Sequence, residues 1–370
     1  MILKLLSLVN FKNHKDLKVD FTNTINCFLG DNGVGKTNLL DSIHYLSFCK
    51  SYYNSFENDN IMHGESFFML QGDFENSSGI DFRVNCSLIK NQKQIKFNNK
   101  KYSKLSDHIG KVPSVIITPL DSNMILGGGD ERRKFIDKIL SQIDGFYLQK
   151  LILYNKTLLQ RNTFLKGVGS SASSDELLST YDDILTDCGS YIYLKRKECV
   201  NSILENVQFY YDYISQKKES INIIYKSQLS SESFKDILIA NRSRDKILKY
   251  TSAGVHRDDF VFNINGHSLK KTGSQGQQKT FLIALKFAYF DLLTKILNTY
   301  PLLLLDDIFD KLDYGRVEQI VRILNENQFG QIFVTDTSLE RITKIMQKVN
   351  VNCKYFIFDK TGLIDERVKN

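Results

Sequence analysis

A glycine-rich segment near the amino terminus has the residue types and spacing of a phosphate-binding loop. Residues 30–37 read Gly-Asp-Asn-Gly-Val-Gly-Lys-Thr, a complete G-x-x-x-x-G-K-T pattern. An apolar run at 25–29 predicts a buried strand before it, and residues 38–43 predict a helix after it, which is the context that the pattern requires. The glycines let successive N–H groups turn toward a phosphate, while Lys36 adds a positive charge and Thr37 a hydroxyl ligand for Mg²⁺. The segment predicts nucleotide binding; the alternative is an ordinary glycine-rich turn between a strand and a helix.

A pair of carboxylates directly after four leucines is the second candidate for chemistry. Residues 302–305 predict a strand buried on both faces, as in the centre of a parallel sheet. Asp306 and Asp307 follow at its carboxyl end, where ligands bind in open α/β folds. Asp306 fits a ligand of Mg²⁺, and Asp307 fits a group that polarises or orients an attacking water. The alternative is that the two aspartates only cap the following loop.

A polar loop at residues 273–280 opens a helix whose apolar positions mark it as buried. By itself it is typical of a helix amino terminus capped by Ser274 or Gln275. A Ser-x-Gly-Gln loop shortly before an acidic strand, however, resembles the signature motif of ABC-type ATPases. In that superfamily the loop of one subunit closes on the γ-phosphate held by another, through the serine hydroxyl, backbone N–H groups and the helix dipole.

The wider pattern predicts an α/β domain whose two halves flank a helical insertion. Residues 2–30 predict strands, the helix after the glycine-rich loop runs to about residue 49, and residues 66–118 alternate as in an antiparallel meander. After residue 250, strands are expected at 260–264, 301–305, 332–335 and 355–358. Helices are expected to start near residues 277, 314 and 338.

The insertion is expected to contain two long helices, at residues 146–165 and 175–214. The stretch between them, residues 167–174, is the most linker-like of the chain. A heptad-like seam in the second helix consists of Leu177, Tyr181, Ile184, Cys188 and Tyr191. Because polar residues interrupt this seam after about two heptads, we expect a short helical arm with a flexible tip.

The composition is that of a globular protein without a membrane span. Of the 370 residues, 42% are hydrophobic and 25% are charged, and no run of about 18 apolar residues occurs. The start of the chain is no convincing signal peptide, and six scattered cysteines without a C-x-x-C pair indicate reduced thiols of a cytosolic protein. The net charge of +7 favours polyanionic partners only weakly, because a nucleotide site itself recruits basic residues.

Together with further segments, these motifs resemble the RecF family of bacterial DNA repair ATPases over nearly the whole chain. The most specific segments are Arg-Arg-Lys-Phe at 132–135, His-Arg-Asp-Asp at 256–259 and Ser-Gln-Gly-Gln-Gln at 274–278. The resemblance implies an ABC-type ATPase head of mixed α/β structure with an inserted helical arm. The expected limits are 1–125 and 251–370 for the two parts of the head and 126–250 for the arm.

The resemblance also implies roles for single residues. Lys36, Asp307 and Ser274 are expected to act in hydrolysis, and Thr37 and Asp306 to hold Mg²⁺. Asp313 is expected in the loop that joins two half-sites. The residues expected to bind ATP are Gly30, Asp31, Asn32, Gly33, Val34, Gly35, Lys36, Thr37, Asn38, Ser274, Gln275, Gly276 and Gln277. Thr335 stands where many ABC-type ATPases have a γ-phosphate-sensing histidine, and no glutamine after residue 50 matches their metal-proximal loop.

The implied function is ATP-dependent DNA binding in replication, repair, recombination and the SOS response to DNA damage. ATP would join two copies, the homodimer would bind single- and double-stranded DNA at gaps and junctions, and a weak, DNA-stimulated ATPase would release it. Members of the family act with RecR and RecO to place RecA on single-stranded DNA. Two alternatives stay open: a DNA-free ABC-type ATPase driving a transporter or another assembly, and a scaffold that binds ATP as a structural ligand.

Three further clusters have two interpretations each. Residues 256–259 either contact the nucleotide or a partner, or form an internal ion-paired turn. Arg132, Arg133 and Lys134 either meet DNA phosphates or form a solvated helix face. A set of aromatic residues either stacks on bases or packs within the arm; its members are Tyr191, Tyr193, Phe209, Tyr210, Tyr211 and Tyr213.

Overall fold

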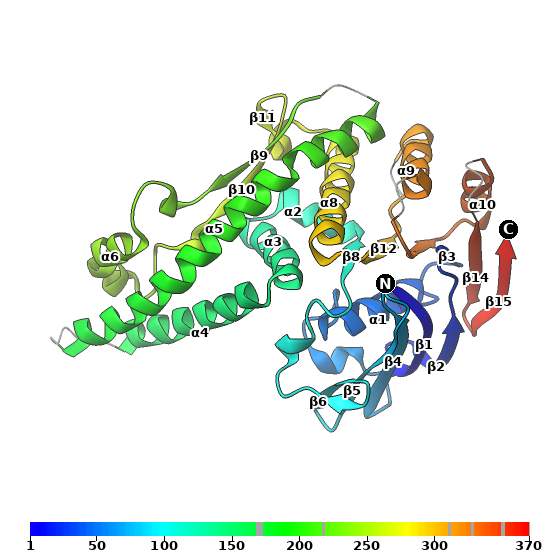
Figure 1. Ribbon diagram of the computed structural model, residues 1–370, viewed down its shortest axis with the longest axis horizontal. Coiled ribbons are helices and arrows are strands. Elements are labelled where there is room, and N and C mark those ends of the chain that lie inside the picture. The colour runs from blue at the N-terminus through cyan, green and yellow to red at the C-terminus, as the bar shows by residue number, and fades with distance from the viewer. Residues whose placement is uncertain (168–172, 217–218, 310–311, 327–328, 349–351, 370) are drawn as a thin grey trace. The chain divides into compact units, whose positions relative to one another are not determined.

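The computed structural model describes residues 1–167, 173–216, 219–309, 312–326, 329–348 and 352–369. The chain divides into two compact units, whose elements are labelled in Figure 1. Unit 1 comprises residues 1–121, 209–217 and 279–370, and unit 2 comprises residues 122–208 and 218–278. Most of the predicted linker, residues 168–172, lies outside the described residues.

Unit 1 contains an antiparallel sheet that includes the amino terminus. Its strand order is β2-β1-β4-β5-β6-β7. The bounds are β1 (Ile2–Phe11), β2 (His14–Asp20), β4 (Phe67–Glu75), β5 (Asp81–Ile89), β6 (Gln92–Phe97) and β7 (Lys100–Lys101). Buried residues alternate with less buried ones along β4 and β5. One face of the sheet therefore packs on the core and the other faces solvent, as the alternation predicts.

A second sheet of unit 1 carries the nucleotide motifs. Its strand order is β15-β14-β3-β13-β12-β8, and all neighbours are parallel except β14 and β15. The bounds are β3 (Ile25–Leu29), β8 (Ser114–Ile117), β12 (Leu302–Asp306), β13 (Ile332–Asp336), β14 (Cys353–Asp359) and β15 (Gly362–Lys369). Every residue of β3, β8, β12 and β13 is buried, which explains their nearly unbroken apolar sequences.

One predicted strand lies in the other sheet. The sequence pattern places residues 115–117 in the antiparallel meander, and this prediction is wrong. In the structure β8 pairs in parallel with β12, with Val115 opposite Leu303. Because all four residues of β8 are buried, its sequence shows no alternation that would separate a parallel strand from a meander strand.

Helix α1 (Lys36–Phe48) lies between the two sheets and contacts strands of both. Leu39, Leu40, Ile43 and Leu46 are fully buried in the core that the sheets share. Helices α9 (Tyr314–Glu326) and α10 (Leu339–Lys348) and most of α8 (Gln275–Leu297) complete the unit. Since α1 directly follows β3, its amino end lies at the carboxyl edge of the parallel sheet.

Unit 2 consists of helices and a small sheet of order β11-β10-β9. The bounds are α2 (Ser122–Leu126), α3 (Gly129–Ile143), α4 (Gly145–Gly167), α5 (Ser173–Ser215), α6 (Phe234–Leu248), α7 (Leu269–Thr272), β9 (Ile221–Lys226), β10 (Asp259–Ile264) and β11 (His267–Ser268). The end of α5, from residue 209 on, belongs to unit 1. Helices α4 and α5 run side by side (Figure 1) and are joined by the ion pairs Lys150–Asp187 and Arg161–Asp182. They form the predicted helical arm, whereas α6 and β9 were not predicted.

The predicted seam of α5 is only partly correct: Cys188 is fully buried as predicted, but the other buried positions lie one residue further along the chain. Leu178, Leu185 and Ile192 are fully buried, whereas Leu177 is 38% exposed. Asp182 also lies on the buried face, where it pairs with Arg161 at 2.8 Å. Hydrophobic periodicity assigns charged residues to the solvent side, so the predicted seam lies one residue away from the buried face at every position except Cys188.

All six cysteines are buried, and they form no disulfide among the described residues. Within the same residues, no helix combines the length and the apolar character needed to cross a bilayer.

Candidate functional site

The glycine-rich loop has two positions that only glycine can occupy. Gly30 has a φ of +147°, and a Cβ there would lie 2.2 Å from the carbonyl oxygen of Phe358. Gly35 has a φ of +105°, and a Cβ there would lie 2.5 Å from Asn13 Nδ2 and 2.6 Å from His14 Nε2. Strand β14 and the turn between β1 and β2 thus approach the loop closely. Gly30 is required by space as well as by backbone conformation, and Gly35 is required by its backbone conformation.

The amino end of α1 is built to receive an anion. Gly35 is its N-cap, no side chain caps it, and its first turn contains no acidic residue. The N–H groups and the helix dipole at such an end both favour negative charge. Lys36 Nζ donates hydrogen bonds to the carbonyl oxygens of Gly30 and Asp31, at 2.7 and 2.8 Å. Burial lowers the pKa of Lys36, although the nearby carboxylates, Asp307 first, act in the opposite direction.

Thr37 and Asp306 meet although 269 positions separate them in the sequence. Thr37 Oγ1 donates a hydrogen bond of 2.8 Å to Asp306 Oδ1. The strand register explains the contact: β13 lies between β3 and β12, with Thr335 opposite Asp306 and Asp336 opposite Leu29. A hydroxyl and a carboxylate are hard oxygen donors of the kind that Mg²⁺ prefers. The two residues expected to hold the metal are therefore placed side by side.

Thr335 positions both aspartates at the end of β12. Its buried hydroxyl donates to Asp306 Oδ1 at 2.8 Å and accepts the backbone N–H of Asp307 at 3.0 Å. Asp307 has a φ of +46°, a left-handed conformation that is uncommon outside glycine. Such conformations cluster at functional sites. These contacts give Thr335 a role in orienting the Asp306 carboxylate and in holding the backbone of Asp307. The γ-phosphate-sensing role suggested by its position stays a prediction.

Tyr53 belongs to the site, and sequence reasoning missed it. Its hydroxyl donates a hydrogen bond of 2.6 Å to Asp306 Oδ2, so hydrogen bonds reach both oxygens of that carboxylate. Burial and the charge of Asp306 raise the pKa of Tyr53, which keeps the hydroxyl protonated as a donor. The sequence shows only a polar aromatic segment after α1. A search there for a hydroxyl donor, and not only for a glutamine, would have identified Tyr53.

Asp41 of α1 fixes the turn that carries Tyr53. The Asp41 carboxylate is fully buried and accepts the Tyr52 N–H at 2.7 Å and the Ser51 hydroxyl at 2.6 Å. Lys12 Nζ lies 2.6 Å from Asp41 Oδ2 and 5.4 Å from the centroid of the Tyr53 ring. The helix that begins at the phosphate-binding loop thus also sets the position of Tyr53.

The predicted signature loop lies in unit 2 at the start of α8 and forms a capping box. Ser274 Oγ accepts the Gln277 N–H at 3.2 Å, and Gln277 Oε1 accepts the Ser274 N–H at 2.8 Å. Gln277 Nε2 also donates to Glu219 at 2.7 Å. Ser274 and Gln275 are exposed, so they are open to contact from another molecule. The roles predicted for Ser274, Gln275, Gly276 and Gln277 across a dimer stay predictions.

Residues 256–259 form the internal turn that was one of their two interpretations. Arg132 Nε pairs with Asp259 at 2.7 Å, and Arg133 donates to the Asp258 carbonyl oxygen at 2.5 Å. The same contacts show that Arg132 and Arg133 do not belong to a solvated helix face, so that interpretation of residues 132–134 is wrong for these two residues. The side chain of Lys134 is 59% exposed, whereas those of Arg132 and Arg133 are only 11% and 17% exposed.

His256 predicts a loss of stability in mild acid. Tyr154 OH lies 2.7 Å from its Nδ1, and its Nε2 lies 3.1 Å from the Thr251 carbonyl oxygen. Nε2 must therefore carry the hydrogen, and Nδ1 accepts from the tyrosine. Burial lowers the pKa of His256 to about 4 from a usual 6.5. Between pH 6.5 and about 4, His256 binds a proton in the unfolded chain but not in the folded chain. The free energy of unfolding should therefore fall by up to about 3 kcal/mol as the pH approaches 4.

Urea unfolding between pH 7 and about pH 4 measures this effect. A His256→Gln variant keeps one donor and one acceptor but does not titrate, so its stability should depend less on pH. His14 and His108, whose pKa values burial also lowers, remain in the variant and provide the background. Equal pH dependence of the two proteins would contradict the assignment.

Comparison with known proteins agrees with this geometry. The family model described as "RecF/RecN/SMC N terminal domain" matches residues 2–356. The DNA replication and repair protein RecF of Phocaeicola vulgatus is 45% identical over 369 residues, which are 99% of each chain. The RecF protein of Parabacteroides distasonis is 46% identical over 351 residues, which are 95% of each chain.

A solved structure is similar to this chain in both fold and sequence. The structure described as the recombination mediator protein RecF-ATP in the RecFOR pathway is 28% identical and covers 99% of each chain, with a TM-score of 0.87. The structural match covers the phosphate-binding loop, the acidic strand, the predicted signature loop and the helical arm. By full-length sequence and by fold, the chain belongs to the RecF family of DNA replication and repair proteins, which are ABC-type ATPases.

Proposed function

We propose that this chain binds and hydrolyses ATP to control its binding to DNA in replication, repair and recombination. The hydrogen bond of 2.8 Å between Thr37 Oγ1 and Asp306 Oδ1 carries the ATPase part of the proposal, because it joins the phosphate loop to the acidic strand. The relatives, described as DNA replication and repair proteins, support the DNA part. They give no support to the alternative of a DNA-free ATPase that drives a transporter.

ATP and Mg²⁺ fit the residues at the carboxyl edge of the parallel sheet. The uncapped end of α1 and Lys36 suit the phosphates, and Thr37 and Asp306 supply oxygen ligands for the metal. Bound Mg²⁺ would neutralise charge on the phosphates. Asp307, held by Thr335 through its backbone N–H, is the group we assign to orient or deprotonate the attacking water.

Removing the Tyr53 hydroxyl is expected to weaken metal binding. In a Tyr53→Phe variant, Asp306 Oδ2 loses the 2.6 Å hydrogen bond that fixes its orientation. Loss of such an outer partner of a metal ligand typically costs about 10–100-fold in metal affinity. Titration with Mn²⁺ followed by electron paramagnetic resonance, in the presence of a non-hydrolysable ATP analogue, measures the affinity without turnover.

The neighbouring tyrosine provides the matched control. Tyr52 OH donates to Asp121 Oδ1 at 2.7 Å, and a Tyr52→Phe variant loses a hydroxyl from the same turn without losing a contact to Asp306. Its metal affinity should stay close to that of the unmodified protein. Unchanged affinity in Tyr53→Phe would show that Asp306 is oriented by Thr37 and Thr335 alone.

We further propose that ATP joins two copies of the chain. In this arrangement Ser274, Gln275, Gly276 and Gln277 of one copy close on the nucleotide of the other, and Asp313 lies between the half-sites. The dimer would bind single- and double-stranded DNA at gaps, with DNA stimulating a weak ATPase. RecR- and RecO-type proteins are the expected partners, and loading of RecA the expected outcome. The RecFOR description of the similar structure supports these partners.

The division into head and arm and the location are parts of the same proposal. The head would comprise 1–125 and 251–370, and the arm 126–250. The buried thiols fit a reducing cytoplasm.

ATP-dependent dimerisation on gapped DNA tests the proposed function. Sedimentation of the full chain should show a dimer with ATP, a monomer without it, and joint sedimentation with a gapped duplex. A Lys36→Arg variant should not dimerise, because a guanidinium does not replace the compact ammonium at the phosphates. Dimerisation of that variant with ATP would contradict the proposed site.

A further inference from the structure

The positive charge of the chain is concentrated in one short segment. Residues 90–104 contain six lysines and no aspartate or glutamate. This segment therefore carries a charge of +6, whereas the whole chain carries +7. Positive and negative charges nearly cancel in the rest of the chain, so the charge of this segment needs an explanation of its own.

The segment forms strands β6 and β7 and the two tight turns that precede them. The Lys90–Asn91 turn connects β5 to β6, and the Asn98–Asn99 turn connects β6 to β7. Both residues of each turn have positive φ, +50° and +59° in the first and +47° and +65° in the second. Two-residue turns of this kind match the twist of antiparallel strands. The lysines are therefore held by strands and tight turns and not on a flexible tail, with Lys96 opposite Lys101 and Lys100 opposite Phe97.

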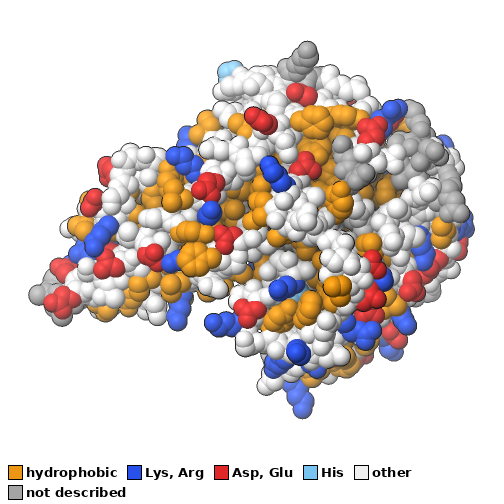
Figure 2. Space-filling model, viewed as in Figure 1, with side chains coloured by type: hydrophobic (Ala, Val, Ile, Leu, Met, Phe, Trp, Pro, Cys, Tyr) orange, Lys and Arg blue, Asp and Glu red, His pale blue; other side chains and the backbone are white. Residues whose placement is uncertain are grey.

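Five of these lysines are exposed and have no carboxylate partner among the described residues. We call them the lysine surface; they are Lys90, Lys96, Lys100, Lys101 and Lys104. The sixth, Lys93, is less exposed and pairs with Glu57. Figure 2 shows blue side chains at the lower end of unit 1, where Figure 1 places β5 and β6.

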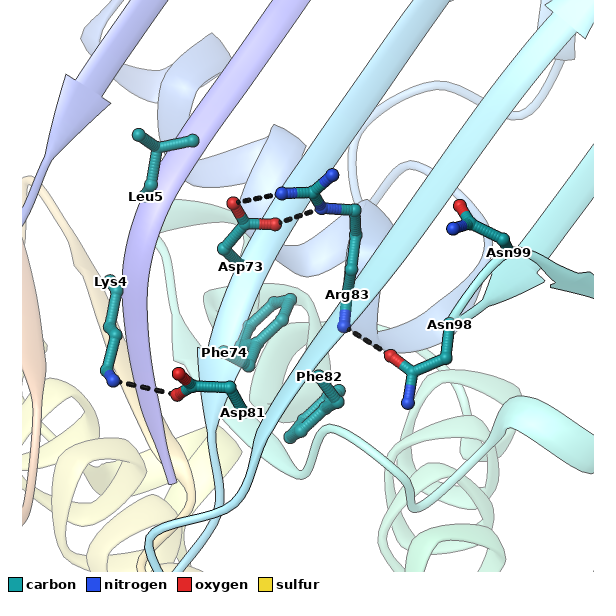
Figure 3. A pocket seen from close by; sticks show the side chains of 9 residues that line it. All are labelled: Lys4, Leu5, Asp73, Phe74, Asp81, Phe82, Arg83, Asn98 and Asn99. Carbon is teal, nitrogen blue, oxygen red and sulfur yellow. Dashed lines mark hydrogen bonds and ion pairs between the residues drawn. The ribbon is translucent and has the colours of Figure 1, made fainter.

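The neighbouring strands show how charges on this sheet are normally arranged. Figure 3 shows Arg83 of β5 bound to Asp73 of β4 and Lys4 of β1 bound to Asp81. These ion pairs have N–O distances of 2.5 and 2.7 Å. The lysine surface lacks this compensation. Lys96 is even paired directly with Lys101 across β6 and β7, and like charges in this position destabilise a sheet. Such local conflicts mark functional sites.

We propose that the lysine surface contacts the sugar–phosphate backbone of DNA. A phosphate backbone brings closely spaced negative charges, and neutralising them releases counterions. It would also relieve the repulsion between Lys96 and Lys101. Lysine contacts to phosphate carry no sequence information, which suits a protein that must act wherever DNA is damaged. This proposal rests on the proposed function and adds the surface through which it operates.

Salt dependence of DNA binding tests the surface. A Lys96→Gln/Lys101→Gln variant should bind a labelled duplex more weakly, and the slope of log Kobs against log[salt] should fall by about 2 units, since each phosphate contact contributes about 0.9. The matched control is Lys295→Gln/Lys360→Gln, which removes two exposed lysines elsewhere in unit 1. Its slope should equal that of the unmodified protein. Equal losses in both variants would overturn the proposal.

A second variant separates loss of binding from loss of folding. Lys101→Glu replaces a like-charge pair by an opposite-charge pair, so its melting temperature should equal or exceed that of the unmodified protein, while its DNA affinity falls. If Lys101→Glu bound DNA as tightly as the unmodified protein, the lysine surface would not be the DNA contact, but the proposed function would stand. A chain that binds no DNA in its unmodified form would overturn the proposed function. If the variants keep full DNA affinity but lose binding to polyglutamate, the surface docks an acidic protein and the DNA assignment is wrong.

Discussion

An Asp307→Asn variant is expected to bind ATP and to dimerise, but to hydrolyse ATP about 10²–10⁴ times more slowly, the usual contribution of a general base. The amide keeps the size of the side chain and loses the charge that orients or deprotonates water. Backbone geometry should be preserved, because the left-handed conformation at φ +46° is tolerated by asparagine and because Thr335 holds the backbone N–H and not the side chain.

Single-turnover phosphate release measures the loss, and sedimentation with ATP shows whether the dimer persists. The control is Asp306→Asn, one residue earlier. Asp306 accepts hydrogen bonds from Thr37, Thr335 and Tyr53, so its variant should lose metal affinity and therefore the ATP-dependent dimer as well. If Asp307→Asn released phosphate at the normal rate, another group would have to act on the water.

An Arg161→Met variant is expected to destabilise unit 2 by about 3–5 kcal/mol, the usual cost of breaking a buried ion pair by removing one partner. Arg161 is fully buried in the arm and pairs with Asp182 at 2.8 Å and Asp245 at 2.7 Å. It also donates to Thr251 Oγ1 at 2.9 Å. Methionine fills much of the volume, but it leaves two buried carboxylates without their common cation.

Urea unfolding followed by circular dichroism measures this change, since unit 2 is rich in helix. The matched control is Arg322→Met, because Arg322 forms an i,i+4 pair with Glu318 and its side chain is 44% exposed. Exposed pairs of this type contribute little to stability. If both variants lost the same small amount, the charge cluster of the arm would not be a source of stability.

Local sequence predicted the elements that have their own periodicity or their own motif. The strand, loop and helix around residues 25–43 are present because apolar runs, glycines and helix-forming residues each specify local structure. Helices α4 and α5 were predicted for the same reason. Failures occurred where burial removes alternation, as in β8, or where a charge is buried, as at Asp182.

The sequence alone thus determined which groups can do chemistry: a phosphate loop with Lys36 and Thr37, and the carboxylates Asp306 and Asp307. Only the tertiary structure decided how these groups are held. Tyr53 donates to Asp306 from a turn that Asp41 fixes, and the strand register places Thr335 beside Asp306. Such contacts arise because parallel strands far apart in the chain bring their carboxyl ends to one edge, and no local pattern records which side chains will meet there.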